Sequence, residues 1–179
     1  MGTAGVQIAR ALGCTVIGTS RTQDKLDRAR ALGLDVAIVP AKGASGPSFA
    51  DRVLAETNGR GVDVVLELVG GPYMTENLRA CATRGRIVVV GLTAGATSEV
   101  ELGVLMHKRL EIVGTALRSR PLEEKNEAAR MLERTIAAWL ARGVVKAIVD
   151  RVFPFADAGA AHAHVASDAT FGKVLLSMA

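Results

Sequence analysis

Residues 2–33 read GTAGVQIARALGCTVIGTSRTQDKLDRARALG, and this stretch decides the fold that we expect. Apolar residues recur at helical spacing over 3–12, and Cys14–Thr19 forms an apolar run typical of a buried strand. A second amphipathic helix is predicted over 23–32. The glycine-rich start of the first helix looks like the end of a G-x-G-x-x-G phosphate-binding turn. The buried strand and the first glycine of that turn would lie before Met1.

The rest of the chain repeats this alternation of strands and helices. Strands are predicted at 36–39, 62–69, 87–90 and 110–117, and near 148–153 and 174–176. Helices are predicted from Phe49 to about Asn58, over 73–82, from Pro121 onward and around 157–166, with a loop from Pro40 to Ser48. The pattern predicts an α/β fold, a Rossmann-like doubly wound parallel sheet without its first strand. We expect a nucleotide-binding domain over 1–146 and a separate C-terminal segment over 147–179.

The composition agrees with a compact α/β protein of 179 residues. Hydrophobic residues make up 49% of the chain and aromatic residues only 3%, which suits strands covered by helices on both faces. No apolar run reaches the roughly 18 residues that a membrane span needs, and no secretory segment precedes the first helix. Cys14 and Cys81 lie far apart, so a disulfide framework is not indicated and a reducing cytoplasm is expected.

The formal net charge of +4 does not form a nucleic-acid surface. Lys and Arg are scattered along the predicted helices and stand near acids, as in 24–28 and 123–125. The one concentrated basic run, 107–109, is short. A solvated surface therefore explains the charge better than a nucleic-acid patch.

The second predicted strand ends in residues that favour a phosphate. A site that prefers NAD usually ends this strand with an acid, which accepts a bond from the ribose 2′-hydroxyl. Here Ser20, Arg21 and Thr22 follow, with Lys25 one turn later and no carboxylate before Asp24. Hydroxyls and cations suit a 2′-phosphate, so the sequence favours NADPH over NADH. The alternative is an ordinary basic helix start.

Five stretches resemble the C-terminal half of the zinc-independent quinone oxidoreductases, in the medium-chain dehydrogenase/reductase superfamily. They are residues 2–33, GVDVVLELVGG, GRIVVVGLTAG, KRLEIVGTALRSRPLEEK, and DRVFPFADAGAAHAH with the closing FGKVLLSM. The run VGTALRSRPLEEK and the closing FGK look most like the p53-inducible quinone oxidoreductase type. The resemblance implies hydride transfer from NADPH to a quinone or an activated alkene, in a homodimer that pairs through the strand at 109–115.

The resemblance also implies which residues bind NADPH. The amides of Gly2 and Thr3 would hold the pyrophosphate, although tight helix packing explains such glycine-rich starts equally well. The 2′-phosphate would be held by Thr22 and Lys25, with Ser20 nearby and Arg21 as an extra ligand. The other implied positions are Gly70 at the adenosine side, Gly91 and Leu92 beside the nicotinamide ribose, and Leu117 and 171–173, including Phe171 and Lys173, at the nicotinamide end. A tyrosine common after the third strand is replaced by Pro40, which weakens the case for NADP.

No residue is identified as catalytic, and no metal site is expected. His162 and His164 stand two apart on a predicted helix and point different ways, and His107 lies in a loop-like region. A GroES-like catalytic domain and the first strand of the nucleotide fold would precede this chain, and loss of that strand would expose the edges of both neighbouring strands. The segments near 148–155 and 173–178 would then be less well anchored or packed differently.

Three other functions stay open. The chain would be a nucleotide-binding or interaction module without turnover, an enoyl reductase domain of a larger synthase, or, with least support, a nucleic-acid-binding protein. Quinone-dependent oxidation of NADPH distinguishes the first from a reductase, and strongly salt-dependent binding marks the last.

Overall fold

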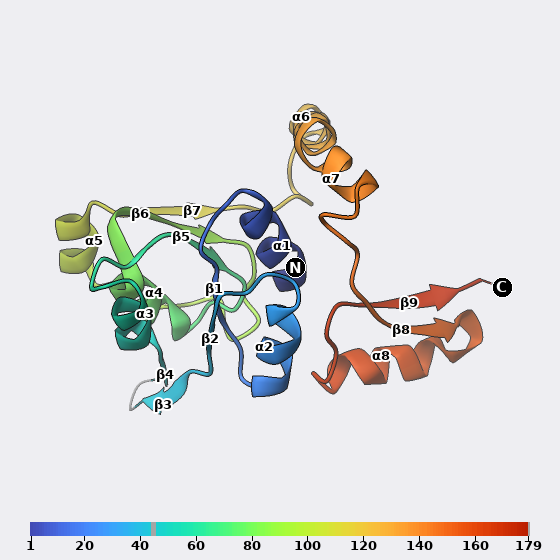
Figure 1. The fold of residues 1–179 in the computed structure, drawn as a ribbon, viewed down its shortest axis with the longest axis horizontal. Coiled ribbons are helices and arrows are strands. Elements are labelled where there is room, and N and C mark those ends of the chain that lie inside the picture. The colour runs from blue at the N-terminus through green and yellow to red at the C-terminus, as the bar shows by residue number, and fades with distance from the viewer. Residues whose placement is uncertain (44–45, 179) are drawn as a thin grey trace.

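The computed structural model describes residues 1–43 and 46–178, in which helices and strands alternate (Figure 1). The helices are α1 (Gly2–Ala11), α2 (Gln23–Arg30), α3 (Ala50–Glu56), α4 (Tyr73–Ala80), α5 (Leu102–Lys108), α6 (Leu122–Leu132), α7 (Ala138–Ala141) and α8 (Ala158–Ala166). The strands are β1 (Ile17–Thr19), β2 (Val36–Ile38), β3 (Ala41–Gly43), β4 (Gly46–Ser48), β5 (Val62–Glu67), β6 (Cys81–Val89), β7 (Glu111–Gly114), β8 (Val149–Pro154) and β9 (Lys173–Ser177). A π-helical turn at Glu133–Ala137 joins α6 to α7.

The strands joined by single helices pair in parallel, as the alternation predicts. β1 pairs with β2, and β5, β6 and β7 form a three-stranded sheet in that order. Helices α2, α4 and α5 make the connections between these neighbours. Parallel strands need such crossovers, so the α/β fold class is confirmed.

These parallel strands do not form one continuous sheet. Within residues 1–43 and 46–178, no pairing joins β1 to β5. On β5, the side chains of Val64 and Leu66 are 63% and 47% exposed, although parallel sheets usually bury both faces. The edges of β1 and β5 are therefore open here, as expected for a sheet without its first strand.

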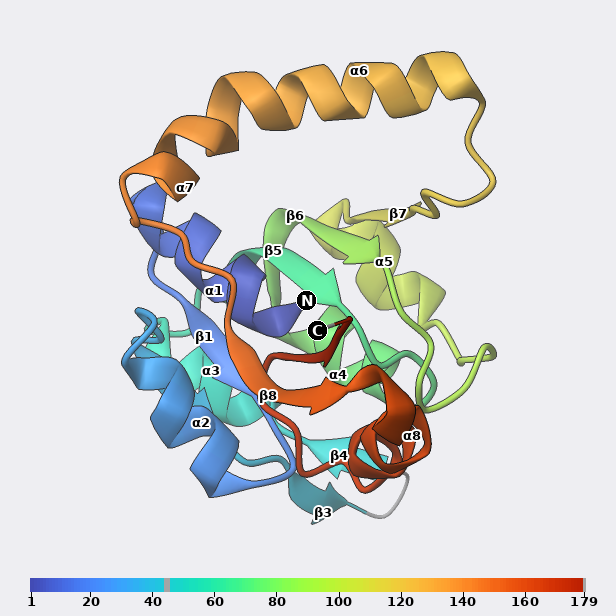
Figure 2. The same ribbon diagram turned by 90° about the vertical axis from the view of Figure 1, so that its right-hand side faces the viewer.

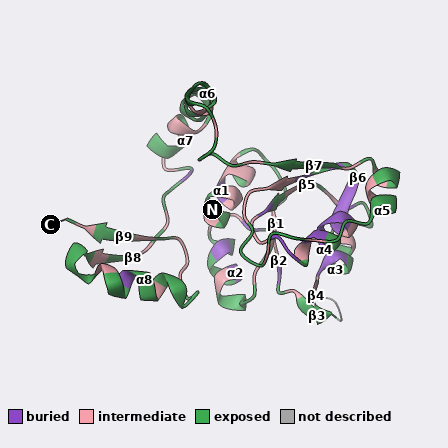
Figure 3. Cartoon of the chain, turned by 180° about the vertical axis from the view of Figure 1, so that it is seen from behind, coloured by how far each residue is buried: buried purple, intermediate pink, exposed green. Residues whose placement is uncertain are grey.

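The core lies mainly against β6 and α4, where Figure 3 shows the buried residues gathered. Leu78, Cys81 and Ile87 are fully buried, and Met74 joins them. A second cluster joins α3 to the end of α4, and a third packs Leu26 of α2 against the strand that follows it. These clusters come from the helix faces that the apolar periodicity marks in the sequence.

The C-terminal residues form a unit of their own, which we call the C-terminal unit (149–177). β8 and β9 pair in parallel, and α8 crosses between them. Figures 1 and 2 show this unit at one end of the molecule, beside α1 and α2 and away from β6. Its strands are thus paired with each other rather than left without a partner.

Helix α6 stands off from the rest of the molecule in both views (Figures 1 and 2). Pro121 directly precedes it, and Glu123 and Glu124 lie in its first turn, as predicted. None of its residues is buried. Within residues 1–43 and 46–178, no helix is long and apolar enough to cross a membrane.

Two local predictions are wrong. The expected loop from Pro40 to Ser48 contains an antiparallel hairpin of β3 and β4, around residues that lie outside the described part. Its strands are short and carry no apolar alternation, so their pattern reads as a loop. The loop-like region around His107 is α5, which ends at Arg109 in a left-handed conformation. The helix is short and lacks a glycine stop, and its apolar side chains pack on the cluster around Ile87.

Candidate functional site

The loops predicted to border the adenosine and the nicotinamide ribose lie at the carboxyl ends of β5 and β6. Gly70 has a φ of +72°, and a Cβ there would lie 2.9 Å from a methyl carbon of Leu92. A Cβ on Gly91 would lie 2.5 Å from the carbonyl oxygen of Leu68. The two loops are therefore in backbone contact, and both positions require glycine. The methyl of Leu68 reaches within 4.0 Å of the Cβ position at Gly2, so the start of α1 adjoins them.

A buried carboxylate, that of Glu67, holds the Gly70 loop against α4, and the sequence analysis missed it. Glu67 is 3% exposed and accepts hydrogen bonds from the amides of Val69 and Gly70, the latter at 2.8 Å, and from the side-chain amide of Asn77. The backbone carbonyl of Glu67 accepts from the amide of Gly91 at 3.2 Å. An acid at the end of an apolar strand, three residues before a pair of glycines, is the sequence signal that would identify it.

The predicted 2′-phosphate residues form one group at the end of β1 and the start of α2. Thr22 is the N-terminal cap residue of α2, and its amide donates to Ser20 Oγ at 3.4 Å. Lys25 follows one turn later, and its side chain is 22% exposed, whereas that of Arg21 is 73% exposed. The structure thus brings together Ser20, Arg21, Thr22 and Lys25.

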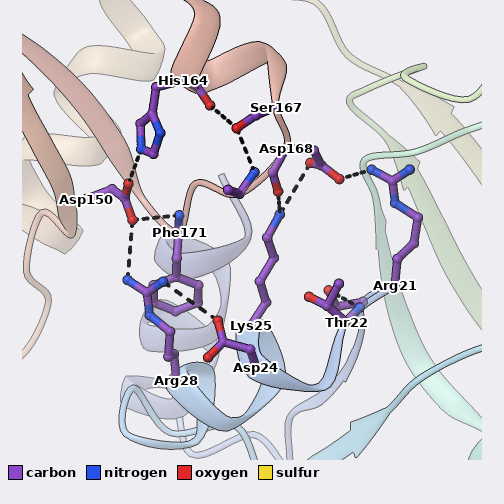
Figure 4. A network of polar contacts seen from close by, with 12 residues as sticks. Arg21, Thr22, Asp24, Lys25, Arg28, Asp150, His164, Ser167, Asp168 and Phe171 are labelled. Atoms are coloured by element: carbon purple, nitrogen blue, oxygen red, sulfur yellow. Dashed lines mark hydrogen bonds and ion pairs between the residues drawn. The ribbon is translucent and has the colours of Figure 1, made fainter. Parts of the chain in front are cut away.

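A distant carboxylate lies against this group (Figure 4). Asp168, in the loop between α8 and β9, forms ion pairs with Arg21 and Lys25, the latter at 3.3 Å. Lys25 also donates to the backbone carbonyl of Asp168. Both cations therefore already have an anionic partner within the chain, although the sequence shows no carboxylate at the end of the strand.

A second carboxylate fastens the C-terminal unit to α2 (Figure 4). Asp150 accepts from His164 Nε2 at 2.8 Å, from the amide of Phe171 at 3.0 Å and from Arg28 at 3.3 Å. The hydrogen bond from His164, followed by those from Phe171 and Arg28, lowers the pKa of Asp150 to about 2, against the effect of desolvation. His164 thus acts here as a structural partner of Asp150.

Phe171, predicted to lie at the nicotinamide end, packs against α2 in the structure. The guanidinium of Arg28 lies over its ring, 4.4 Å from the centroid. The ring also packs against the apolar cluster of Leu26, Ala29 and Leu34. The predicted nicotinamide residue therefore adjoins the group expected to hold the adenosine phosphate.

The remaining predicted residues are more exposed. Leu92 and Leu117 are 52% and 62% exposed, and Lys173 is exposed at the start of β9, where its amide donates to the carbonyl of Ile148 at 2.8 Å. Gly2 and Thr3 begin α1, and the first amides of a helix have no acceptor within it. Two surface hollows along α6 include none of the predicted cofactor-binding residues.

The cysteine and metal chemistry of the site is limited. Burial raises the pKa of the Cys81 thiol to about 11, with the nearby Lys108 ammonium opposing it, so Cys81 is a core residue and not a nucleophile. Among the described residues, no three His, Cys, Asp or Glu side chains gather where they could hold a metal ion.

Comparison with known proteins places this geometry in a family. The sequence model of the zinc-binding dehydrogenase family matches residues 1–134. A 2-haloacrylate reductase of Burkholderia sp. is 30% identical over 98% of this chain, which covers 52% of that protein. A phthioceranic/hydroxyphthioceranic acid synthase of Mycobacterium tuberculosis is 35% identical over 51% of the chain, which covers 4% of that protein.

Solved structures agree with this assignment. The Escherichia coli quinone oxidoreductase complexed with NADPH superposes with a TM-score of 0.77 at 31% identity. The match covers 98% of this chain and 53% of that one. The chain thus spans about half the length of the reductases that it matches.

Proposed function

The chain belongs to the zinc-binding dehydrogenase family of the medium-chain dehydrogenase/reductase superfamily, and on that premise we propose that it binds NADPH. The proposal extends to its activity: it would be the cofactor-binding part of an enzyme that reduces a quinone or an activated alkene by hydride transfer. Similarity to a 2-haloacrylate reductase and to a quinone oxidoreductase complexed with NADPH supports this reading. The stretch 113–125 favours the p53-inducible type within that group.

One observation carries the cofactor assignment. The cations of Arg21 and Lys25 converge on Asp168 near the carboxyl end of β1, where Thr22 precedes α2 and where ligands bind in open parallel sheets. Guanidinium and ammonium groups bind phosphate oxygens through charge-assisted hydrogen bonds. The residues present therefore fit a 2′-phosphate better than an unmodified ribose.

The other predicted residues have separate tasks in this proposal. The amides of Gly2 and Thr3 would donate to the pyrophosphate at the start of α1. The loops of Gly70 and Gly91, which Glu67 ties together, would let the cofactor backbone lie close to the protein. Leu92, Leu117 and Lys173 would border the nicotinamide. NADPH supplies the hydride when bound, and these residues position it.

The test is cofactor binding by a double variant. In the protein with Arg21→Ala and Lys25→Ala, we expect NADPH to bind about 10- to 100-fold more weakly, because two charge-assisted bonds are lost. NADH should be affected much less. Arg30→Ala, at the other end of α2, is the matched control. Fluorescence titration measures both cofactors, and an equal loss for NADH and NADPH would refute a 2′-phosphate site.

An enoyl reductase role is a second candidate. The similarity to a phthioceranic/hydroxyphthioceranic acid synthase, over half of this chain, supports it. Assays with NADPH should then show reduction of an enoyl thioester and little reduction of quinones. The reverse preference supports a quinone reductase.

Domain division and assembly belong to the same proposal. Residues 1–146 would form the cofactor-binding domain and 147–179 a segment that joins other parts of the protein.

β7 is exposed along its length, including Ile112 and Val113, and would pair with a second copy. Light scattering of the wild type and of Ile112→Lys tests this, since a charge on the edge should give a monomer.

A further inference from the structure

The cations of the proposed phosphate site are already neutralised from within the chain. Asp168 lies 147 residues from Arg21 and 143 from Lys25 in sequence, and pairs with both side chains (Figure 4). Its carboxylate accepts from each cation, and its carbonyl accepts a second bond from Lys25. An anion of the protein therefore occupies the place where an anion of the ligand would bind.

The loop that carries Asp168 is held in place on both sides. The amide of Asp168 donates to the carbonyl of Val165 at 3.2 Å, and Ser167 Oγ donates to the carbonyl of His164 at 2.7 Å. Three residues later the amide of Phe171 donates to Asp150 at 3.0 Å. Because its neighbours are fixed, the Asp168 carboxylate is presented to the two cations at a high effective concentration.

We propose that Asp168 lowers the preference for NADPH over NADH by competing with the 2′-phosphate of NADPH for Arg21 and Lys25. This inference rests on the proposed function, since it concerns the same site. A phosphate monoester carries about −1.5 to −2 charges near neutral pH and a carboxylate carries one, so the phosphate displaces the carboxylate. Breaking the ion pairs of Asp168 costs free energy, which lowers the net affinity for NADPH.

NADH does not meet this competition. Its ribose bears a neutral 2′-hydroxyl, which need not displace Asp168, and a carboxylate is the group that accepts a bond from that hydroxyl in NAD-preferring sites. Asp168 comes from the far end of the chain yet supplies an acid close to the place where those sites have one. Asp168 therefore lowers the ratio of NADPH affinity to NADH affinity below the value that Arg21 and Lys25 alone would give.

The size of the effect follows from exposure. The side chains of Arg21 and Asp168 are 73% and 58% exposed, and Lys25 is 22% exposed. Exposed ion pairs contribute little, so removal of Asp168 should tighten NADPH binding about three- to ten-fold rather than by orders of magnitude. The effect should shrink as salt rises.

The experiment compares wild type with Asp168→Asn. Asp168 has a φ of 58°, a conformation that Asn tolerates well and Ala does not, so Asn removes the charge and keeps the loop. Asp157→Asn, at the other end of α8, is the control that removes one exposed negative charge from the same unit. Titrations use NADPH, NADH, and the fragments 2′,5′-ADP and 5′-AMP, which confine the readout to the phosphate.

The inference predicts that Asp168→Asn binds NADPH and 2′,5′-ADP about three- to ten-fold more tightly, with NADH and 5′-AMP unchanged or weaker. Asp157→Asn should behave as wild type. If wild type binds NADPH and Asp168→Asn leaves it unchanged, or tightens all four ligands equally, the inference is wrong and the proposed function stands. If NADPH binds no better than NADH and loss of Arg21 and Lys25 has no effect, both are wrong.

Discussion

The sheet of β5, β6 and β7 and the C-terminal unit share a topology, yet different forces hold them. Both consist of parallel strands joined by single helices. In the first, Leu78 and Ile87 are fully buried, and Figure 3 shows buried residues gathered along α4 and part of β6. In residues 149–177, only Ala161 is buried, and Leu175 and Leu176 are 44% and 39% exposed.

The C-terminal unit is fixed to the rest of the chain largely by charged groups. Asp150 and Asp168 bind Arg28, Lys25 and Arg21 on and before α2, while Phe171 supplies the apolar part of the contact. The same topology thus carries no guarantee of the same stability. The more weakly packed contact also lies beside the proposed phosphate site, where a ligand would compete with it.

The largest expected effect on stability comes from truncating one leucine in each region. Leu78→Ala removes a side chain that is 1% exposed, so we expect a loss of about 2–5 kcal/mol in the free energy of unfolding. Leu176→Ala in β9 should cost about 1 kcal/mol, because its side chain is already partly hydrated. Urea denaturation measures both. Equal losses would show that the two regions are packed alike.

The next largest effect on stability is expected from neutralising a buried carboxylate of the sheet, compared with an exposed one. Glu67→Gln places an NH₂ group among donors that now point at a carboxylate, which should cost about 1–3 kcal/mol. Glu111→Gln breaks only the exposed pair with Arg86 and should cost less than about 1 kcal/mol. Thermal or urea unfolding compares them. A larger loss for Glu111→Gln would contradict the burial argument.

The smallest effect depends on pH and concerns the C-terminal unit. The pKa of Asp150 is lowered from 3.8 to about 2, so the unfolded chain binds the proton first. The stabilisation is therefore fully present above about pH 4 and is lost as pH falls toward 2, and it amounts to about 1–2 kcal/mol. Asp150→Asn should lower stability at neutral pH. The difference from wild type should shrink as the pH falls toward 2 and vanish only below the folded-state pKa, so a full difference that persists at about pH 1 would contradict the assigned cause.

Much of the fold is predictable from apolar periodicity, since both helices of residues 2–33 and most parallel strands occur where expected, although β6 begins at Cys81, within the predicted helix 73–82. Periodicity reports only neighbours within an element, however. It did not show that, among the described residues, β8 and β9 pair only with each other, apart from the other strands, because that depends on tertiary packing. Nor could it find Asp168 beside Lys25, since a contact over 143 residues leaves no local pattern.

The residues of the candidate site likewise fall into those that the local sequence predicts and those that it does not. Gly70, Gly91 and the cations after β1 are visible because a turn or a phosphate requires those residue types locally. Glu67 was missed because an acid within an apolar run reads as an interruption of the strand, and its donors come from a loop and from α4.

The topology also has a consequence for the order of folding. Each parallel pairing joins strands separated by one helix, so each closes a short loop at low entropic cost. The contacts that span the chain, Gln7 with Lys146 and Lys25 with Asp168, join residues 139 and 143 apart. Local contacts form fastest, so we expect the strand–helix–strand units to form first and these contacts to close last. The cations of the proposed phosphate site would then come together early with α2, and Asp168 would pair with them only in the final step, when distant parts of the chain meet.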